Sequence, residues 1–349
     1  MNIGNLRNRL LISMFLGVLV FVALLAYGDF NEVRKSLNEF RWELFPLILL
    51  VTCGNYALRF VKWEYYLRVI GVQGLARIDS FLIFFSGLGM VVTPGKVGEW
   101  LKSYLLREVH GTPISRSAPI LLAERMTDSL ALLLICSAGV FFFGPETWPF
   151  IAIIGIVSVL AIGVSRHRPT SHSLLGFLGR VPFVRNFSGR FEEMYESTYT
   201  LMEPRGVVLM TGLSVASWSF EVVAFYLTLV GVGASAGYET FLKAAFILPI
   251  STLAAAILLT PGGLFVAEVG IASLSRRLLD LTRSQAAVST LIIRVGTLWL
   301  GVAVGLVTFG ILTHRLARQG KKLDLEAENE MPAEISGERH ATDTAPVEN

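Results

Sequence analysis

Helix-breaking and ionisable residues interrupt long apolar stretches of this sequence, where they could hold a polar group inside a membrane. Two stretches are broken by the same kind of insert, Thr93-Pro94-Gly95-Lys96 and Thr260-Pro261-Gly262-Gly263. A helix loses backbone hydrogen bonds at Pro-Gly, and in hydrocarbon only protein or trapped water replaces them. Paired breaks in two halves of a chain are typical of the binding site of a membrane transporter.

The residues after the first break suit an anion. A helix that begins after Pro94 places Lys96 and Glu99 on one face with Ser103 and Arg107, at spacings of three and four. The free backbone N–H groups at its start favour a phosphate, and Lys96 adds positive charge. The alternative is an ordinary amphipathic helix that happens to begin with Pro-Gly.

The next apolar stretch carries a cluster of charges, Glu124, Arg125 and Asp128, within one helical turn. Arg125 and Arg294, which has no acidic neighbour in the sequence, are candidate counter-charges for a phosphate or carboxylate, because arginine binds both in a bidentate manner. The alternative for the first cluster is a self-neutralising group in which Arg125 reaches Asp128 near the membrane surface. Glu221 either pairs with one of these arginines or carries a proton.

The second break offers two glycines in place of Gly-Lys. Gly262 and Gly263 allow close backbone approach, either to a ligand or to a neighbouring helix. Glu268 follows the break and is a candidate holder of a cationic group or a proton.

The composition defines the broad class. Hydrophobic residues make up 53% and charged residues 16% of the chain, and the mean hydropathy is +0.60. These values predict an all-α polytopic membrane protein. The net charge of +3 gives no indication of a nucleic-acid partner. The two cysteines and five histidines form no catalytic or metal-ligand spacing, so we expect no metal, no cofactor and no enzyme activity.

Hydropathy predicts about six full transmembrane helices and two re-entrant broken-helix hairpins. The spans are residues 10–27, 44–60 or a little beyond, 119–143, 148–164, 207–232 and 286–313, and the second of them ends near Trp63. The hairpins are built on residues 81–92 and 241–259. We expect Arg59, Lys62 and Glu64 to anchor the end of the second span at the interface. Residues 1–316 form the membrane domain, and residues 317–349 are expected to be a disordered acidic cytoplasmic tail.

Basic loop residues orient the helices. Arg7, Arg68, Arg77, Lys102 and Arg116 belong to loops on one side, which the positive-inside rule assigns to the cytoplasm. The basic cluster after residue 313 then also lies there, so both termini are cytoplasmic in the cell (inner) membrane. Three arginines would lie on the outer side and oppose this orientation, namely Arg276, Arg277 and Arg283.

The two halves align with each other. Tyr66-Leu67 matches Tyr226-Leu227 at an offset of 160, the Thr-Pro-Gly motifs match at 167, and Arg125 matches Arg294 at 169. The order is preserved, which predicts repeats over about 44–143 and 207–313. With the topology above the repeats are inverted, as in rocking, alternating-access transporters.

These motifs together resemble a known family. Residues 93–99, the segment Glu124-Arg125-Met126-Thr127-Asp128, and Thr260-Pro261-Gly262-Gly263 with Glu268 are similar to the flippase-like membrane domain of the lysylphosphatidylglycerol synthase transmembrane family. The resemblance covers most of residues 10–313. It implies movement of lipids or lipid-linked sugars between leaflets. The appended aminoacyl-transferring domain of the bifunctional synthases has no counterpart here, so we do not expect synthesis of lysylphosphatidylglycerol.

The second motif departs from the first. Glu268 lies seven residues after Pro261, whereas Glu99 lies five after Pro94. Two residues are roughly 200° around a helix, so the two carboxylates are not assumed to be equivalent.

The favoured function is therefore a lipid flippase whose partners are the bilayer and a phospholipid or lipid-linked sugar. The alternatives are an intramembrane glycosyltransferase or lipid-modifying enzyme with Glu99, Glu124 or Asp128 as a base, and an accessory scaffold of envelope lipid synthesis. A homo-oligomer or association with envelope-synthesis partners is compatible with each of these functions.

Overall fold

The computed structural model shows an all-helical protein. It describes residues 3–92, 97–143, 188–258 and 261–318, together with residues 148–149, 152–153, 155–156, 160 and 163. The helices are α1 (Ile3–Gly28), α2 (Phe30–Glu39), α3 (Phe45–Val69), α4 (Arg77–Leu88), α5 (Val97–His110), α6 (Ile114–Ser117), α7 (Pro119–Phe143), α11 (Ser188–Leu201), α12 (Pro204–Gly231), α13 (Tyr238–Ile257), α14 (Val266–Leu279), α15 (Arg283–Arg294) and α16 (Leu300–Arg318). Short helical turns lie at η1 (Trp42–Leu44), η4 (Pro261–Gly263) and η5 (Val295–Trp299). No strand occurs within these ranges.

Several helices are long and apolar enough to cross a membrane. In the described part of the chain they are Trp42–Val69, Pro204–Gly231, Tyr238–Ile257 and Arg283–Arg318. Twenty residues of helix span about 30 Å, the thickness of the hydrocarbon core. The chain is therefore a multi-pass membrane protein. The number of full crossings and the two re-entrant hairpins stay predictions, and most of the expected span 148–164 and all of the tail from residue 319 lie outside the described residues.

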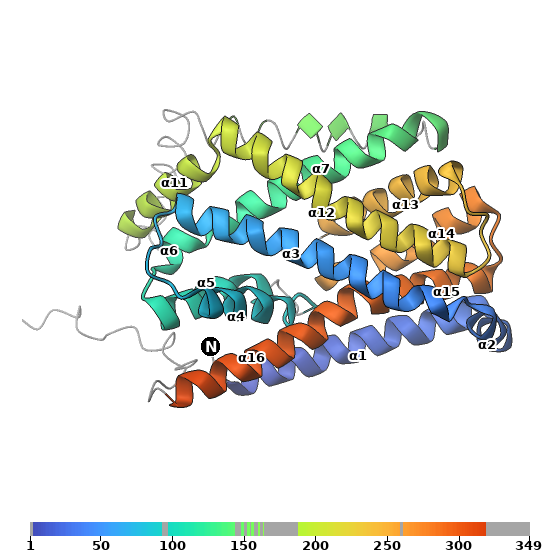
Figure 1. The fold of residues 1–349 in the computed structure, drawn as a ribbon, viewed down its shortest axis with the longest axis horizontal. Helices are drawn as coiled ribbons and strands as arrows, with labels where there is room; N and C mark the ends of the chain where they lie inside the picture. The colour runs from blue at the N-terminus through green and yellow to red at the C-terminus, as the bar shows by residue number, and fades with distance from the viewer. Residues whose placement is uncertain are drawn as a thin grey trace, which may run out of the picture.

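Two apolar cores lie at opposite ends of the molecule. One joins α3, α4 and α5 to the start of α12 and includes Trp63, Ile83 and Leu105. The other joins the rest of α12 to α13, α14 and α15 and includes Phe225 and Phe246. In Figure 1, α4 and α5 lie at the left end, α13 and α14 lie at the right end, and the packed helices α3 and α12 connect the two.

Small residues let the helices around the two ends cross closely. A Cβ atom added to Gly305 of α16 would lie 2.0 Å from the backbone nitrogen of Gly89, just after α4. A Cβ atom added to Gly139 of α7 would lie 2.7 Å from the Cβ atom of Phe246 of α13. Close approach of helices at small residues is usual in membranes. Both crossings, that of α16 over α4 and that of α7 over α13, therefore depend on a glycine.

The second predicted break lies against the residue that precedes the first. A Cβ atom added to Gly262 would lie 3.3 Å from the Cα atom of Val92, the last described residue before the first break. Gly262 and Gly263 have φ angles of 59° and 73°, which glycine adopts without the steric cost that other residues incur. This backbone ends the helical run of α13 and turns the chain into α14. Thr93, Pro94, Gly95, Lys96 and Thr260 lie outside the described residues.

Candidate functional site: a charged cavity beside the second helix break

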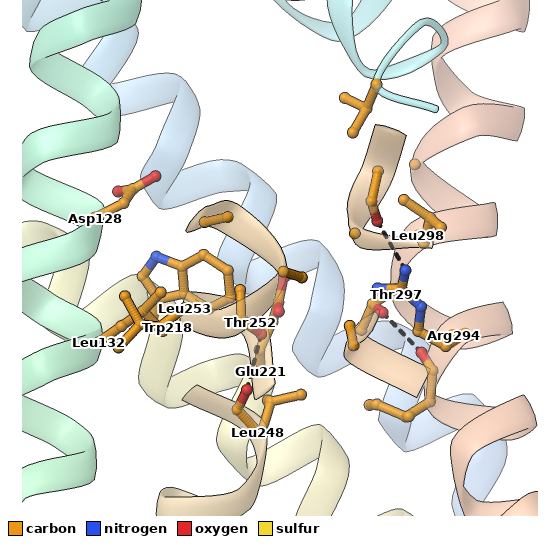
Figure 2. A pocket seen from close by; sticks show the side chains of 18 of the residues that line it. Asp128, Leu132, Trp218, Glu221, Leu248, Thr252, Leu253, Arg294, Thr297 and Leu298 are labelled. Carbon is orange, nitrogen blue, oxygen red and sulfur yellow. Dashed lines mark hydrogen bonds between the residues drawn. The ribbon is translucent and has the colours of Figure 1, made fainter. Parts of the chain in front are cut away.

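A cavity of about 210 Å³ lies beside the second break and is also lined by Val91. It has room for several water molecules or one small polar group, but not for a whole lipid. The residues that line it come from α3, α4, α7, α12, α13, α14, α15, η5 and α16 and from the second break, and the charged ones are Arg59, Arg125, Asp128, Glu221 and Arg294. Figure 2 shows Asp128 on one side, Arg294 on the other, and Trp218 and Glu221 between them.

On one side of the cavity, the carboxylate of Asp128 is held by side chains of two neighbouring helices. Lys62 Nζ of α3 donates a hydrogen bond to Asp128 Oδ1 at 2.6 Å, and Ser214 Oγ of α12 donates to the same oxygen at 2.9 Å. Arg59 Nη2 lies 3.8 Å from Asp128 Oδ2. Lys62 is only 3% exposed and Asp128 5%. Isolated buried charges are very costly, so these charged side chains must stay paired. The pairing holds α3, α7 and α12 together.

A second ion pair supports the same side without lining the cavity. Lys102 Nζ of α5 bonds Glu124 Oε2 of α7 at 2.6 Å. The ammonium group lies 5.0 Å from the centre of the Trp63 ring and 5.4 Å from that of Phe84, so it is enclosed by two aromatic faces. Glu124 is thus a buried structural partner of Lys102.

On the other side of the cavity, Arg294 ties the second break to α14. Its Nε donates to Glu268 Oε1 at 2.6 Å, and its Nη2 donates to the carbonyl oxygen of Gly262 at 2.8 Å. A capping box of Thr282 and Gln285 fixes the start of α15, which carries Arg294 at its end. Glu268 is 2% exposed, and its Oε2 has no hydrogen-bond partner within the described residues. Glu268 therefore neutralises Arg294, the residue expected to lack an acidic neighbour.

The helix changes type directly after Arg294. Val295–Trp299 forms a π-helical turn, an arrangement that is rare and frequent at functional sites. Tyr56 Oη of α3 donates a 2.5 Å hydrogen bond to the carbonyl oxygen of Thr297 in this turn. The turn therefore links the last long helix to the central helix α3 beside the cavity.

One polar group in the cavity is left for a ligand. Glu221 makes no hydrogen bond or ion pair with the described residues, although the charges of Arg59 and Arg294 act on it. Trp218 also lines the cavity, but its indole Nε1–H is buried within the protein and has no acceptor among the described side chains and backbone. The Arg59 guanidinium lies 6.0 Å from the centre of the Trp218 ring. This part of the wall therefore presents a carboxylate and a cation together beside the Trp218 ring.

The cavity brings together several residues that the sequence singled out. Of the predicted site residues, those that line the cavity are Arg125, Asp128, Glu221, Gly262, Gly263 and Arg294. Glu124 and Glu268 are buried close by in ion pairs. Pro261 is described in its backbone only, and Glu99 lies in α5 with its side chain outside the described part of the structure.

Three expectations for basic residues were wrong. Arg59 and Lys62 do not anchor the end of a span at the interface, because α3 continues to Val69 and turns both toward Asp128. Lys102 is not a loop charge but a buried partner of Glu124. A usable signal was present: Tyr56, Arg59 and Lys62 are spaced by three, so a helix that continues past Phe60 places them on one face. Nothing local indicated Trp218.

Comparison with known proteins identifies the class. The sequence profile of the lysylphosphatidylglycerol synthase TM region matches residues 14–305, so the chain belongs to this family. This confirms the resemblance carried by the motifs at the two breaks.

Two relatives are similar over much of the chain. A protein named Glycosyltransferase AglD from Haloferax volcanii is 22% identical over 318 residues, which are 80% of this chain and 50% of the relative. A UPF0104 membrane protein from Methanothermobacter thermautotrophicus is 24% identical over 262 residues, which are 66% of this chain and 73% of the relative. The chain thus spans half the length of the Haloferax protein.

Proposed function

We propose that this protein moves lipids with a charged head group between the two leaflets of the cell membrane, and that the cavity is the path of the head group. One observation carries the proposal. Inside a membrane domain, a cavity beside the second helix break carries the carboxylate of Glu221, which makes no hydrogen bond or ion pair with the described residues, together with the cations Arg59 and Arg294. The family and its resemblance to flippase-like domains support the same function.

The physical reason is the cost of crossing hydrocarbon. A charged side chain at the centre of a bilayer costs on the order of 2.5–3.5 kcal/mol on insertion scales, so residues such as Arg59 and Asp128 are retained there for a reason. A lipid head group meets the same barrier. A cavity with both signs of charge replaces the water around a phosphate or an ammonium group, while the acyl chains stay in the bilayer. The size of the cavity suits this division, since it admits a head group and excludes the tails.

The two ion-pair clusters suggest how the path alternates. The Lys62–Asp128 pair and the Arg294–Glu268 pair lie on opposite sides of the cavity. In an inverted repeat, rocking of one helix pair against the other opens one side while the opposite side stays closed. Each cluster then closes one side of the cavity. An incoming phosphate competes with Asp128 for Arg59 on one side and with Glu268 for Arg294 on the other.

The test is leaflet exchange of fluorescent phospholipids in vesicles that contain the purified full-length protein. We expect exchange well above that of empty vesicles, and its loss in Arg294→Ala and in Glu221→Gln. Arg276→Ala is the matched control, because Arg276 is an exposed arginine near the end of α14, outside the cavity. Exchange equal to that of empty vesicles with wild-type protein, for both phospholipids and a lipid-linked sugar, would overturn the proposal.

A second candidate function is transfer of a sugar to or from a lipid carrier, which the name of the Haloferax relative favours. Asp128 is a poor base for such a reaction because Lys62 and Ser214 occupy the same carboxylate oxygen. Glu221 is the better candidate base. Sugar transfer in detergent that Glu221→Gln abolishes supports this enzyme, whereas loss of leaflet exchange alone supports the flippase.

A further inference from the structure

A second hollow lies on the opposite side of the central helices. It is a groove of about 890 Å³ between the end of α3 and the start of α12, and its floor includes Gly212 and Ala216. Its other lining residues are mostly apolar, among them Phe60, Val61, Val208, Leu209 and Leu213. A Cβ atom added to Gly212 would meet no atom within 4 Å, so the groove is open at this point.

The groove is separate from the charged cavity. Phe60 and Val61 line the groove, whereas Arg59 lines the cavity. On α12, Ala216 lines the groove and Trp218 the cavity. The helices α3 and α12 therefore form a wall with an apolar face on one side and a charged face on the other.

One end of the groove carries positive charge. Arg68 near the end of α3 and Arg77 at the start of α4 line it there, and both are exposed. Neither makes an ion pair with the described residues. The nearby carboxylate of Glu64 accepts a hydrogen bond from Ser80 Oγ. Two arginines at the mouth of an apolar groove are complementary to a molecule with an anionic head and an apolar tail.

The length of the groove matches one leaflet. It follows α3 from Phe60 to Arg68, and eight residues of helix rise about 12 Å. The hydrocarbon core is about 30 Å thick, so the groove extends over somewhat less than one of its two leaflets. The arginines then lie at the level of the phosphates, because they occupy the ends of helices and the groove runs inward from them.

We propose that this groove binds an anionic phospholipid from the surrounding leaflet. One acyl chain lies between α3 and α12 along Gly212 and Leu213, and the phosphate binds Arg68 and Arg77. The site does not depend on whether lipids cross the membrane through the cavity. An acyl chain between α3 and α12 fixes the spacing of these two helices on one side. The positions of Arg59 on α3 and Trp218 on α12 therefore depend on the lipid composition of the leaflet.

The test counts bound lipids by native mass spectrometry of the full-length protein in detergent with equal amounts of dioleoyl phosphatidylglycerol and dioleoyl phosphatidylcholine. We expect wild type to prefer phosphatidylglycerol. The double variant Arg68→Gln/Arg77→Gln should lose roughly tenfold of this preference. The control Arg276→Gln/Arg283→Gln removes two exposed arginines elsewhere on the chain and should keep it.

A second variant tests the groove itself. Gly212→Leu fills open space without a clash, so it should lower the binding of both lipids while the melting temperature stays unchanged. Cys53→Leu adds similar bulk at an exposed position of α3 outside the groove and should bind lipid like wild type. The proposal is overturned if the double variant Arg68→Gln/Arg77→Gln keeps the wild-type preference for phosphatidylglycerol or if Gly212→Leu binds lipid like wild type. It is also overturned if a second protein chain occupies the groove in place of lipid.

Discussion

The two buried carboxylates beside the cavity are stabilised in different ways. Asp128 has one oxygen shared by Lys62 and Ser214, and Arg59 lies near the other. Glu268 has one oxygen bound to Arg294 and one buried oxygen without a partner within the described residues. The side chains of the first cluster join three long helices, α3, α7 and α12. In the second cluster, Arg294 of α15 binds Glu268 of α14 and the backbone carbonyl group of Gly262.

If the cavity opens on alternate sides, as proposed above, this difference predicts which side opens more readily. Separating Lys62 from Asp128 would strand two well-paired buried charges, which is expensive. Glu268 already lacks a partner for one oxygen, so hydration of that carboxylate on opening recovers part of the cost. We therefore expect the side closed by Arg294 and Glu268 to open first, and the side closed by Lys62 and Asp128 to be the more stable reference.

The largest expected effect is on the Asp128 cluster. Lys62→Met should lower the free energy of unfolding by about 3–5 kcal/mol, because Asp128 stays buried with a poorer set of partners. Thermal unfolding in detergent measures the loss. The double variant Lys62→Met/Asp128→Leu should recover much of it, since the buried carboxylate is gone and Arg59 keeps the nearby charge of Glu221. A Lys62→Met protein as stable as wild type would show that the Lys62–Asp128 ion pair does not hold the three helices together.

The same substitution in the other cluster should cost less. For Arg294→Met we expect a loss of about 2–3 kcal/mol, because Arg294 lines the cavity and water can replace its guanidinium beside Glu268, whereas Lys62 does not line the cavity. Thermal unfolding under the same conditions gives the comparison, with Glu268→Leu added as the recovery variant. If Arg294→Met proves the more damaging change, the order of the two sides is reversed.

The two helix crossings allow a third comparison. Gly305→Ala places a methyl group against the backbone of Gly89, which cannot move aside, and should cost about 2–3 kcal/mol. Gly139→Ala meets the Phe246 side chain and should cost about 1–2 kcal/mol, since that side chain can shift. Melting temperatures of the two variants test the order. Equal losses would show that α7 packs on α13 as tightly as α16 packs on α4.

The smallest effect on stability is expected for a substitution of Glu221, which lies between the two clusters. Glu221→Gln should change the free energy of unfolding by no more than about 0.5 kcal/mol, because Glu221 has no ion pair with the described residues to lose. Leaflet exchange should nevertheless fall at least roughly tenfold, the effect of about 1.4 kcal/mol. Unfolding and exchange measured on one preparation separate the two readouts. A variant that loses stability and keeps exchange would give Glu221 a structural role.

The sequence predicted the features that depend on local composition. Hydropathy identified the membrane class, and Pro-Gly at residues 261–262 marked a real break because the backbone there needs positive φ angles. The motifs identified the family. The ion pairs of Lys62 and Lys102 were not predictable in this way. Their partners lie 66 and 22 residues away in the chain, and a basic residue near the end of an apolar run looks the same whether the helix stops or continues.

The π-helical turn at Val295–Trp299 makes the last long helix carry one residue more than an unbroken α-helix of the same height. The extra residue rotates everything beyond it by roughly 100° relative to Arg294. That phase shift lets a single continuous helix aim Arg294 at Glu268 and, farther along, Gly305 at Gly89. Deleting one residue from this turn would keep the helix intact and leave it unable to satisfy both contacts at once.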